Sequence, residues 1–321
     1  MTPLSKGVFL DLESIHPRDL DLDALHTCLP HWTFHDETRA EQVAGRIAGA
    51  QVVVTNKVPL GAGQIHGAAD LRLVCVAATG TDRIDLDAAR QAGVVVSNAR
   101  DYATASVAEA VFAMLLALLR QLDAYRDRVA AGDWPESRHF CLFDKPIEEL
   151  YGKTLGIIGY GVLGHAVAQR AAAFGMRVQI AQRLHGEPTD GRVPLETLLS
   201  TSDVISLHCP LSDTTRNLID DTRLLAMKRN AILINTARGG IVDEQALVRA
   251  LEENRIAGAA IDVLGTEPPP PDNPLLRYRS PRLILTPHVA WASRSARQRL
   301  VSELIENIRA CQQGVPRNCV S

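Results

Sequence analysis

The stretch TLGIIGYGVLG at residues 154–164 decides the fold. A short apolar run, residues 154–158, leads directly into a glycine-rich turn, and an alanine-rich helical stretch follows. In such a unit the first glycine permits the tight turn, the second lets the backbone approach a pyrophosphate, and the third lets helix and strand pack closely. The helix N-terminus adds N–H groups and a partial positive charge. The pattern predicts a dinucleotide site that contains Gly159, Gly161, Val162, Leu163 and Gly164.

A second glycine-rich string, at residues 61–67, has a different context. It does not leave a strand directly, because Lys57, Val58 and Pro59 intervene. We therefore interpret it as an ordinary turn and a short helix, and not as a nucleotide site.

Short apolar runs alternate with helical stretches along most of the chain. Several runs are continuous in Val, Ile and Leu, which is typical of strands covered on both faces. The alternation predicts an α/β protein with two Rossmann-like parallel-sheet domains. The predicted strands are residues 7–10, 51–55, 71–76 and 94–97, then 154–158, 177–180, 204–207, 231–235, 257–262 and 282–286.

The two strand series are separated by residues 102–153. We predict an apolar helix at 104–119, a mixed helix at 123–131 and a loop at 132–145. The C-terminal stretch is predicted to be a helix that returns to the first domain, which makes that domain discontinuous. The expected organisation is a substrate domain at 1–100, an inserted dinucleotide-binding domain at 101–287 and the rest of the substrate domain at 288–321.

The composition argues against several classes of protein. The 321 residues are 46% apolar and 22% charged, as in ordinary globular domains. The formal net charge of -3 leaves no basic surplus for nucleic-acid binding. The longest apolar stretch, residues 105–119, is shorter than the ~20 residues of a bilayer span. The six cysteines match no zinc or disulfide spacing, so we expect no metal site and a reducing, cytoplasmic compartment.

Three polar residues follow strands of the second series: Arg238, Glu267 and His288. A guanidinium fork can engage the carboxylate and carbonyl oxygens of a 2-oxo acid. A Glu267 carboxylate bonded to His288 would stabilise the protonated imidazole and fix its tautomer. Each residue alone also has a plain structural explanation: an ion-pairing arginine, a solvated loop carboxylate and a satisfied histidine. Together, and downstream of a dinucleotide loop, they favour proton and hydride exchange with a hydroxy acid.

Six strings of the sequence resemble the D-isomer-specific 2-hydroxyacid dehydrogenases, and most closely their glycerate dehydrogenase/hydroxypyruvate reductase branch. The strings are VAATGTDRIDLDAAR at 76–90, SVAEAVFAMLLALLR at 106–120, GKTLGIIGYGVLG at 152–164, SDVISLHCPLSDTTRNLI at 202–219, INTARGGIVDE at 234–244 and TPHVAWASRSARQ at 286–298. The resemblance implies hydride transfer between NAD(P)H and C2 of a small 2-oxo acid, such as hydroxypyruvate or glyoxylate.

The same resemblance implies residue roles. Arg238, Glu267 and His288 match the catalytic set, in which the histidine protonates the carbonyl oxygen as hydride reaches C2. Asp262 matches the residue that contacts the nicotinamide carboxamide. The implied substrate contacts are Ala77, Ala78, Thr79, Gly80 and Arg238, and the further cofactor contacts are His208, Cys209, Pro210, Thr236, Ala237, Asp262 and His288.

The chain departs from the family after the second strand of the nucleotide domain. The position of the usual acidic residue reads Ala181-Gln182-Arg183. An acid there would bind the ribose hydroxyls and repel a 2′-phosphate. Neutral Gln182, with Arg183 and His185 nearby, favours NADPH over NADH. In the alternative, Arg183 points into solvent and Gln182 bonds a ribose hydroxyl, which keeps NADH acceptable.

The resemblance also implies two flexibly linked domains and a homodimer joined through the nucleotide domains. The apolar helix at 104–119 lies at that interface or is buried within one subunit. The loop with Trp134, Phe140 and Phe143 reaches the partner's substrate pocket or only packs the dimer. The alternatives in function are a formate- or phosphonate-type dehydrogenase on the same fold, and a non-catalytic, NAD(H)-sensing relative of corepressors.

Overall fold

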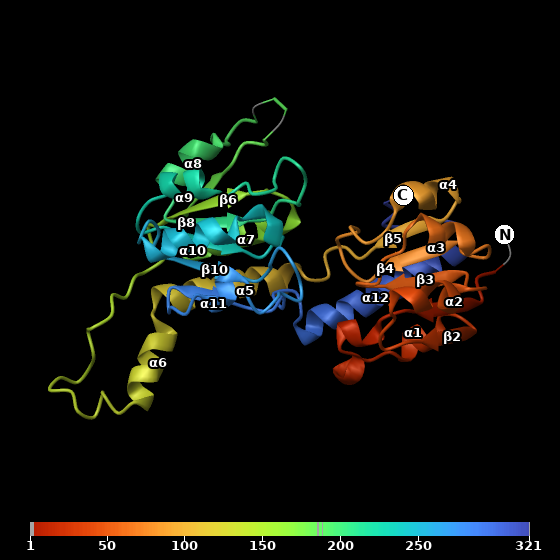
Figure 1. The fold of residues 1–321 in the computed structure, drawn as a ribbon, viewed down its shortest axis with the longest axis horizontal. Coiled ribbons are helices and arrows are strands. Elements are labelled where there is room, and N and C mark those ends of the chain that lie inside the picture. The colour runs from red at the N-terminus through yellow and green to blue at the C-terminus, as the bar shows by residue number, and fades with distance from the viewer. Residues whose placement is uncertain (1–2, 185, 188, 321) are drawn as a thin grey trace. The chain divides into compact units, whose positions relative to one another are not determined.

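The computed structural model describes residues 3–184, 186, 187 and 189–320, and it divides into two compact units (Figure 1). Unit 1 comprises Met1–Ala103 and Trp291–Ser321, and unit 2 comprises Thr104–Ala290. Both divisions fall three residues beyond the boundaries expected from the sequence. His288 thereby belongs to unit 2, because its backbone N–H donates to the Asp262 carbonyl oxygen at 2.8 Å.

The sheet of unit 1 is parallel and has, within the described residues, the strand order β2-β1-β3-β4-β5. The edge strand β2 was not predicted, because its four residues HWTF alternate between exposed and half-buried positions and contain no apolar run. The strands are β1 (Lys6–Phe9), β2 (His31–Phe34), β3 (Val52–Thr55), β4 (Leu73–Val76) and β5 (Val95–Asn98).

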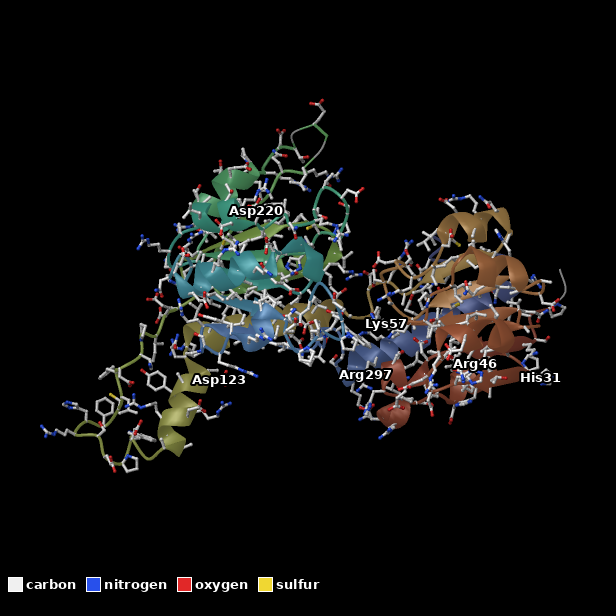
Figure 2. The ribbon with its side chains drawn as sticks, viewed as in Figure 1. His31, Arg46, Lys57, Asp123, Asp220 and Arg297 are labelled. Atoms are coloured by element: carbon white, nitrogen blue, oxygen red, sulfur yellow. The ribbon has the colours of Figure 1, made fainter. Side chains whose placement is uncertain are left out.

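Short helices cover this sheet, and the glycine-rich string at 61–67 forms one of them, as expected. The C-terminal helix α12 (Arg294–Gln312) packs on β4 and α1, so unit 1 is built from both ends of the chain. Arg297 on α12, labelled in Figure 2, donates to both carboxylate oxygens of Asp19 at 2.7 and 2.9 Å. The other helices are α1 (Asp23–Thr27), α2 (Val43–Ile47), α3 (Ala62–Gly67) and α4 (Leu86–Gln91).

The sheet of unit 2 is also parallel, with the order β11-β10-β9-β8-β6-β7 in the described part of the chain. Its strands match the second predicted series to within two residues at each end. The predicted fold class, two Rossmann-like parallel-sheet domains, is therefore confirmed. The strands are β6 (Thr154–Ile158), β7 (Arg177–Ile180), β8 (Val204–Leu207), β9 (Ile232–Asn235), β10 (Gly258–Ile261) and β11 (Leu283–Leu285).

Two apolar cores cover the two faces of this second sheet. One contains Leu115 of α5 and Val167 of α7, and the other contains Leu198 of α8 and Leu247 of α10. This double coverage explains the continuous apolar runs in the strands. The helices are α5 (Thr104–Leu119), α6 (Leu122–Ala130), α7 (Val162–Ala173), α8 (Leu195–Thr201), α9 (Asp221–Ala226), α10 (Glu244–Glu252) and α11 (Pro274–Arg277).

Within the described residues, no single helix has the length and hydropathy of a membrane span. Only α5 and α6 taken together do, with a bend of 56° between them.

Candidate active site

The candidate site of unit 2 is built at the carboxyl ends of its parallel strands. Leu207 pairs with Asn235, and Ile261 pairs with both Asn235 and Leu285. The segments that follow β8, β9, β10 and β11 therefore leave the sheet at one edge, where parallel α/β sheets place their ligands. These segments contain the predicted residues His208, Arg238, Asp262 and His288.

His288 and Glu267 form a hydrogen-bonded pair. His288 Nδ1 lies 2.6 Å from Glu267 Oε2, and the two side chains are 28% and 34% exposed. Glu267 Oε1 accepts the backbone N–H of Leu264 at 2.9 Å, so both carboxylate oxygens are fixed. A carboxylate at Nδ1 makes that nitrogen the proton donor of the pair and leaves Nε2 as the atom that can exchange a proton with a substrate.

Asp262 holds the loop that carries His288. Its carboxylate, 2% exposed, accepts hydrogen bonds from Thr286 Oγ1 at 2.6 Å, Val289 N at 2.9 Å and Ala290 N at 3.0 Å. These three hydrogen bonds hold the backbone of His288 in a strained conformation. Its φ is +55°, in the left-handed region that residues other than glycine rarely adopt. The carboxylate thus holds the loop in this structure, and its contact with the nicotinamide carboxamide stays a prediction.

Arg238 lies on a turn that a buried amide shapes. Asn235 Nδ2 donates to the Arg238 carbonyl oxygen at 2.8 Å, and Asn235 Oδ1 accepts the N–H of Ala237 at 3.0 Å. The next residue, Gly239, touches the segment that leads to Glu267, because a Cβ there would lie 1.9 Å from the carbonyl carbon of Leu264. Only glycine permits this approach, which brings the Arg238 turn against the Glu267 loop.

The glycine-rich turn before α7 has the features that a pyrophosphate needs. Gly159 has a φ of +93°, and a Cβ there would lie 2.5 Å from the backbone nitrogen of Cys209. A Cβ on Gly164 would lie 2.2 Å from the carbonyl oxygen of Gly159, so this glycine lets helix and turn pack. At Gly161, by contrast, no described atom lies within 4 Å of a Cβ, which leaves room for a ligand beside the helix N-terminus.

Two buried polar groups lie at the ends of β8 and β9. His208 Nδ1 and Thr236 Oγ1 are buried and have no hydrogen-bond partner in the part of the chain that the structure describes. Burial lowers the pKa of His208 to about 4, so its ring is neutral at pH 7, and its Nε2 lies 2.8 Å from Ser206 Oγ. Buried polar groups are rarely left unpaired, so these residues and the glycine turn fit a bound dinucleotide.

Gln182 is bonded within its own loop. Its Nε2 donates to the carbonyl oxygens of Thr189 at 3.1 Å and Arg192 at 3.3 Å, and its Oε1 accepts the N–H of Thr189 at 2.9 Å. Arg183 beside it is exposed, and His185 lies outside the described residues. In this structure the Gln182 side chain therefore holds residues 189–192 in place by hydrogen bonds.

The predicted substrate turn, residues 77–80, belongs to unit 1, where it follows β4. Thr79 Oγ1 donates to the carbonyl oxygen of Ala99 at 2.9 Å, and Asn98 Nδ2 donates to the carbonyl oxygen of Thr79 at 2.7 Å. The turn is thus held by the end of the neighbouring strand β5.

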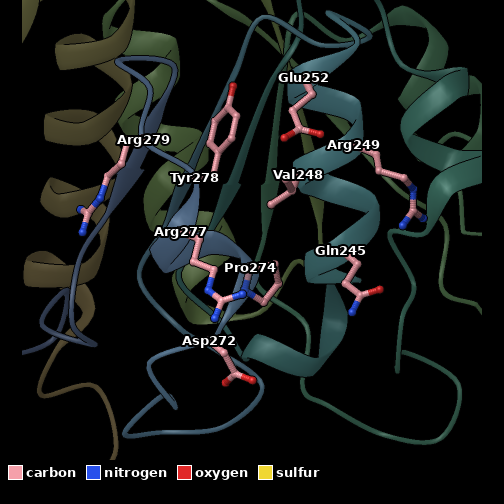
Figure 3. A pocket seen from close by; sticks show the side chains of 9 residues that line it. All are labelled: Gln245, Val248, Arg249, Glu252, Asp272, Pro274, Arg277, Tyr278 and Arg279. Carbon is pink, nitrogen blue, oxygen red and sulfur yellow. The ribbon is translucent and has the colours of Figure 1, made fainter.

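A cavity of about 600 Å³ lies on α10 and the segment around α11 (Figure 3). Among the described residues that form it, none belongs to the predicted site, so it is separate from the strand-end chemistry. Its lining residues are Gln245, Val248, Arg249, Glu252, Asp272, Pro274, Arg277, Tyr278 and Arg279.

The fold and the site define a class: an α/β dehydrogenase with a dinucleotide-binding unit and a hydrogen-bonded histidine–carboxylate pair at its strand ends. Residues 112–290 match the family model described as D-isomer specific 2-hydroxyacid dehydrogenase, NAD binding domain. Glycerate dehydrogenase of Methylorubrum extorquens is 46% identical over 98% of this chain and 98% of its own length. The chain belongs to the D-isomer-specific 2-hydroxyacid dehydrogenase family.

Two further relatives agree with this membership. Hydroxypyruvate reductase of Blautia hydrogenotrophica is 36% identical over 98% of this chain and 99% of its own. The NADPH-dependent glyoxylate/hydroxypyruvate reductase of Sinorhizobium meliloti, solved in complex with NADP and malonate, superposes with a TM-score of 0.83 at 27% identity, over 99% of this chain and 97% of that one. The predicted family, its glycerate dehydrogenase/hydroxypyruvate reductase branch and the enzyme class are therefore confirmed.

Proposed function

We propose that the protein transfers a hydride between NAD(P)H and C2 of a small 2-oxo acid. Hydroxypyruvate would give D-glycerate, and glyoxylate would give glycolate. The observation that carries the proposal is the 2.6 Å hydrogen bond between Glu267 and His288, at the sheet edge that also bears Arg238. The names of the relatives support the choice of substrates.

Each residue of the set has a defined task in this proposal. The nicotinamide, when bound, supplies the hydride. His288 Nε2 gives its proton to the carbonyl oxygen, and Glu267 stabilises the imidazolium at Nδ1. The Arg238 guanidinium binds the carboxylate and polarises the carbonyl group.

A substrate panel tests the reaction class. We expect reduction of hydroxypyruvate and glyoxylate, a D-configured product, and poorer turnover of bulky 2-oxo acids. The measurement is loss of the reduced nicotinamide absorbance with NADH and with NADPH, followed by chiral analysis of the product. Formate and phosphonate oxidation are the controls for the alternative dehydrogenases. Binding of NAD(H) without turnover of any 2-oxo acid would replace the proposal with a sensing role.

We also propose that the protein forms a homodimer. The segment after α6 extends away from the sheet of unit 2 (Figure 1) and exposes Phe140 by 88%, Phe143 by 83% and Trp134 by 52%. Exposed aromatic side chains at this density mark a surface that another chain covers. Light scattering at micromolar concentration should give twice the mass of the chain, and Phe140→Ser with Phe143→Ser should lower it. A monomeric mass for the unaltered protein would contradict the proposal.

The cysteines support a further part of the proposal, a reducing, cytoplasmic compartment. The structure describes all six, and each is a free thiol. Burial raises the pKa of the Cys28 thiol to about 11 and also raises that of Cys209. Thiols that stay protonated oxidise slowly. The backbone of Cys209 lies against Gly159 of the glycine turn, so we propose that Cys209 is a small wall residue there.

A further inference from the structure

One carboxylate, that of Glu244, grips both ends of the loop that carries Glu267. Glu244 is the first residue of α10. Its Oε1 accepts the N–H of Gly265 at 2.6 Å, and its Oε2 accepts Asn273 Nδ2–H at 2.6 Å. Asn273 is fixed in this orientation, because its Oδ1 caps α11 by accepting the N–H of Leu275 at 2.9 Å.

This grip connects to the acid–base pair through the backbone. Leu264, next to Gly265, donates the hydrogen bond that fixes Glu267 Oε1 at 2.9 Å, and Glu267 Oε2 meets His288 Nδ1. On the other side, Gly239 packs against Leu264 and leaves no space between the two turns. Movement of Gly265 away from Glu244 would therefore move the donor that aims the Glu267 carboxylate.

We propose that Glu244, held in place by Asn273, is a positioning residue that orients the Glu267 carboxylate toward His288. The inference rests on the proposed function, in which this pair carries the proton. A helix-dipole role for an acid in the first turn would contribute to stability only. The N-terminus of α10 already has a cap, since Asp243 accepts the N–H of Ala246 at 3.0 Å.

Among the described residues, two carboxylates bond His288 or its loop. Glu267 meets Nδ1, and the Asp262 carboxylate accepts the N–H of Val289 at 2.9 Å. Arg238 follows β9, which β10 separates from β11 in the sheet. Glu244 contacts none of the His288 ring atoms in these hydrogen bonds. A change of proton affinity would therefore arise through the orientation of Glu267 or through the lost charge, and variants that keep or add a carboxylate, Glu244→Asp and Asn273→Asp, separate these two causes.

Two single substitutions and their combination test the arrangement. Glu244→Gln sets an amide donor against the Asn273 donor, and Asn273→Asp sets two acceptors together while it keeps the α11 cap. Each should shift the alkaline limb of the pH profile of reductive kcat/KM to lower pH by about 0.5–1 unit, since the imidazolium loses part of its carboxylate partner. The double variant restores donor to acceptor at both bonds and should return the profile to that of the unaltered protein.

Glu252→Gln, at the far end of the same helix (Figure 3), is the matched control, and its profile should be unchanged. Glu244→Asp keeps the first-turn charge but shortens the reach, and should shift the limb as Glu244→Gln does. A lower Tm with an unshifted limb, in the variants that fold, would reduce Glu244 to a purely structural role.

A second readout does not depend on turnover. NMR titration of the His288 imidazole, assigned with His288→Gln, should show the same downward shift in the single variants and its recovery in the double variant. If the unaltered protein reduces no 2-oxo acid, the proposed function fails, while this titration still decides the positioning. An unshifted His288 titration in every folded single variant would overturn the inference.

Discussion

Replacement of His288 by alanine should lower kcat for hydroxypyruvate reduction by about 10²–10⁴-fold, the range for loss of a positioned general acid. In the proposed function, Nε2 of this ring exchanges the proton, because Nδ1 is bonded to Glu267 at 2.6 Å. The loop should survive the change, since Asp262 holds it through the backbone N–H groups of Val289 and Ala290. Steady-state kcat and KM measure the effect.

His288→Asn is the matched control for backbone strain. Asparagine tolerates the left-handed φ of +55° better than alanine does. Both variants should lose activity alike and bind the reduced cofactor as the unaltered protein does. A fall of less than tenfold in kcat would remove His288 from the role of general acid.

Glu267→Gln should keep part of the activity and change its dependence on pH. In the proposed function, reduction needs His288 in its protonated form. Without the carboxylate the imidazolium is less stable, so His288 loses its proton at a lower pH. The alkaline limb of reductive kcat/KM should therefore move to lower pH by about 1–2 units, a larger shift than in the Glu244 variants. An unchanged profile would contradict the pairing.

The second large effect concerns the cofactor. We expect Arg183→Ala to lower kcat/KM with NADPH by about 5-fold to 10³-fold and to leave the value with NADH unchanged. The estimate follows from opposite charges at ~4 Å, which attract by about 1–4 kcal/mol between water and partly shielded surroundings. The exposed guanidinium of Arg183 follows Gln182 directly after β7, where the family's acid would repel a 2′-phosphate.

The structure decides which substitution tests this best. The Gln182 amide ties the loop to Thr189 and Arg192, so Gln182→Asp would release the loop as well as add a charge. Arg183→Ala removes the guanidinium and leaves the Gln182 hydrogen bonds in place. Arg229→Ala is the control for lost charge. This exposed arginine precedes β9 and so lies at the amino ends of the strands, opposite the candidate site. Calorimetric titration of NADP⁺ and NAD⁺ should repeat the kinetic result, and a tenfold preference of the unaltered protein for NADH would refute it.

The sequence by itself determined both parallel sheets and the glycine turn. Continuous apolar runs locate strands that are buried on both faces, and a glycine pattern between strand and helix is a local signal. The edge strand β2 was not predicted for the same reason, since its HWTF residues alternate between exposed and half-buried positions. His288, Glu267 and Arg238 were also visible, because each follows a predicted strand and carries the right chemistry.

Only the tertiary structure decided how these groups are held. The Asp262 carboxylate accepts hydrogen bonds from Val289 and Ala290. The Glu244 carboxylate accepts hydrogen bonds from Gly265 and Asn273. Each of these partners lies more than twenty residues away in the sequence. Such partners depend on which strands are neighbours and on their register, which composition and periodicity do not encode. A carboxylate at a strand end or in a first helical turn looks alike in the sequence whether it meets solvent or a loop. Its task is set by the donors that the folded sheet edge brings within hydrogen-bond distance.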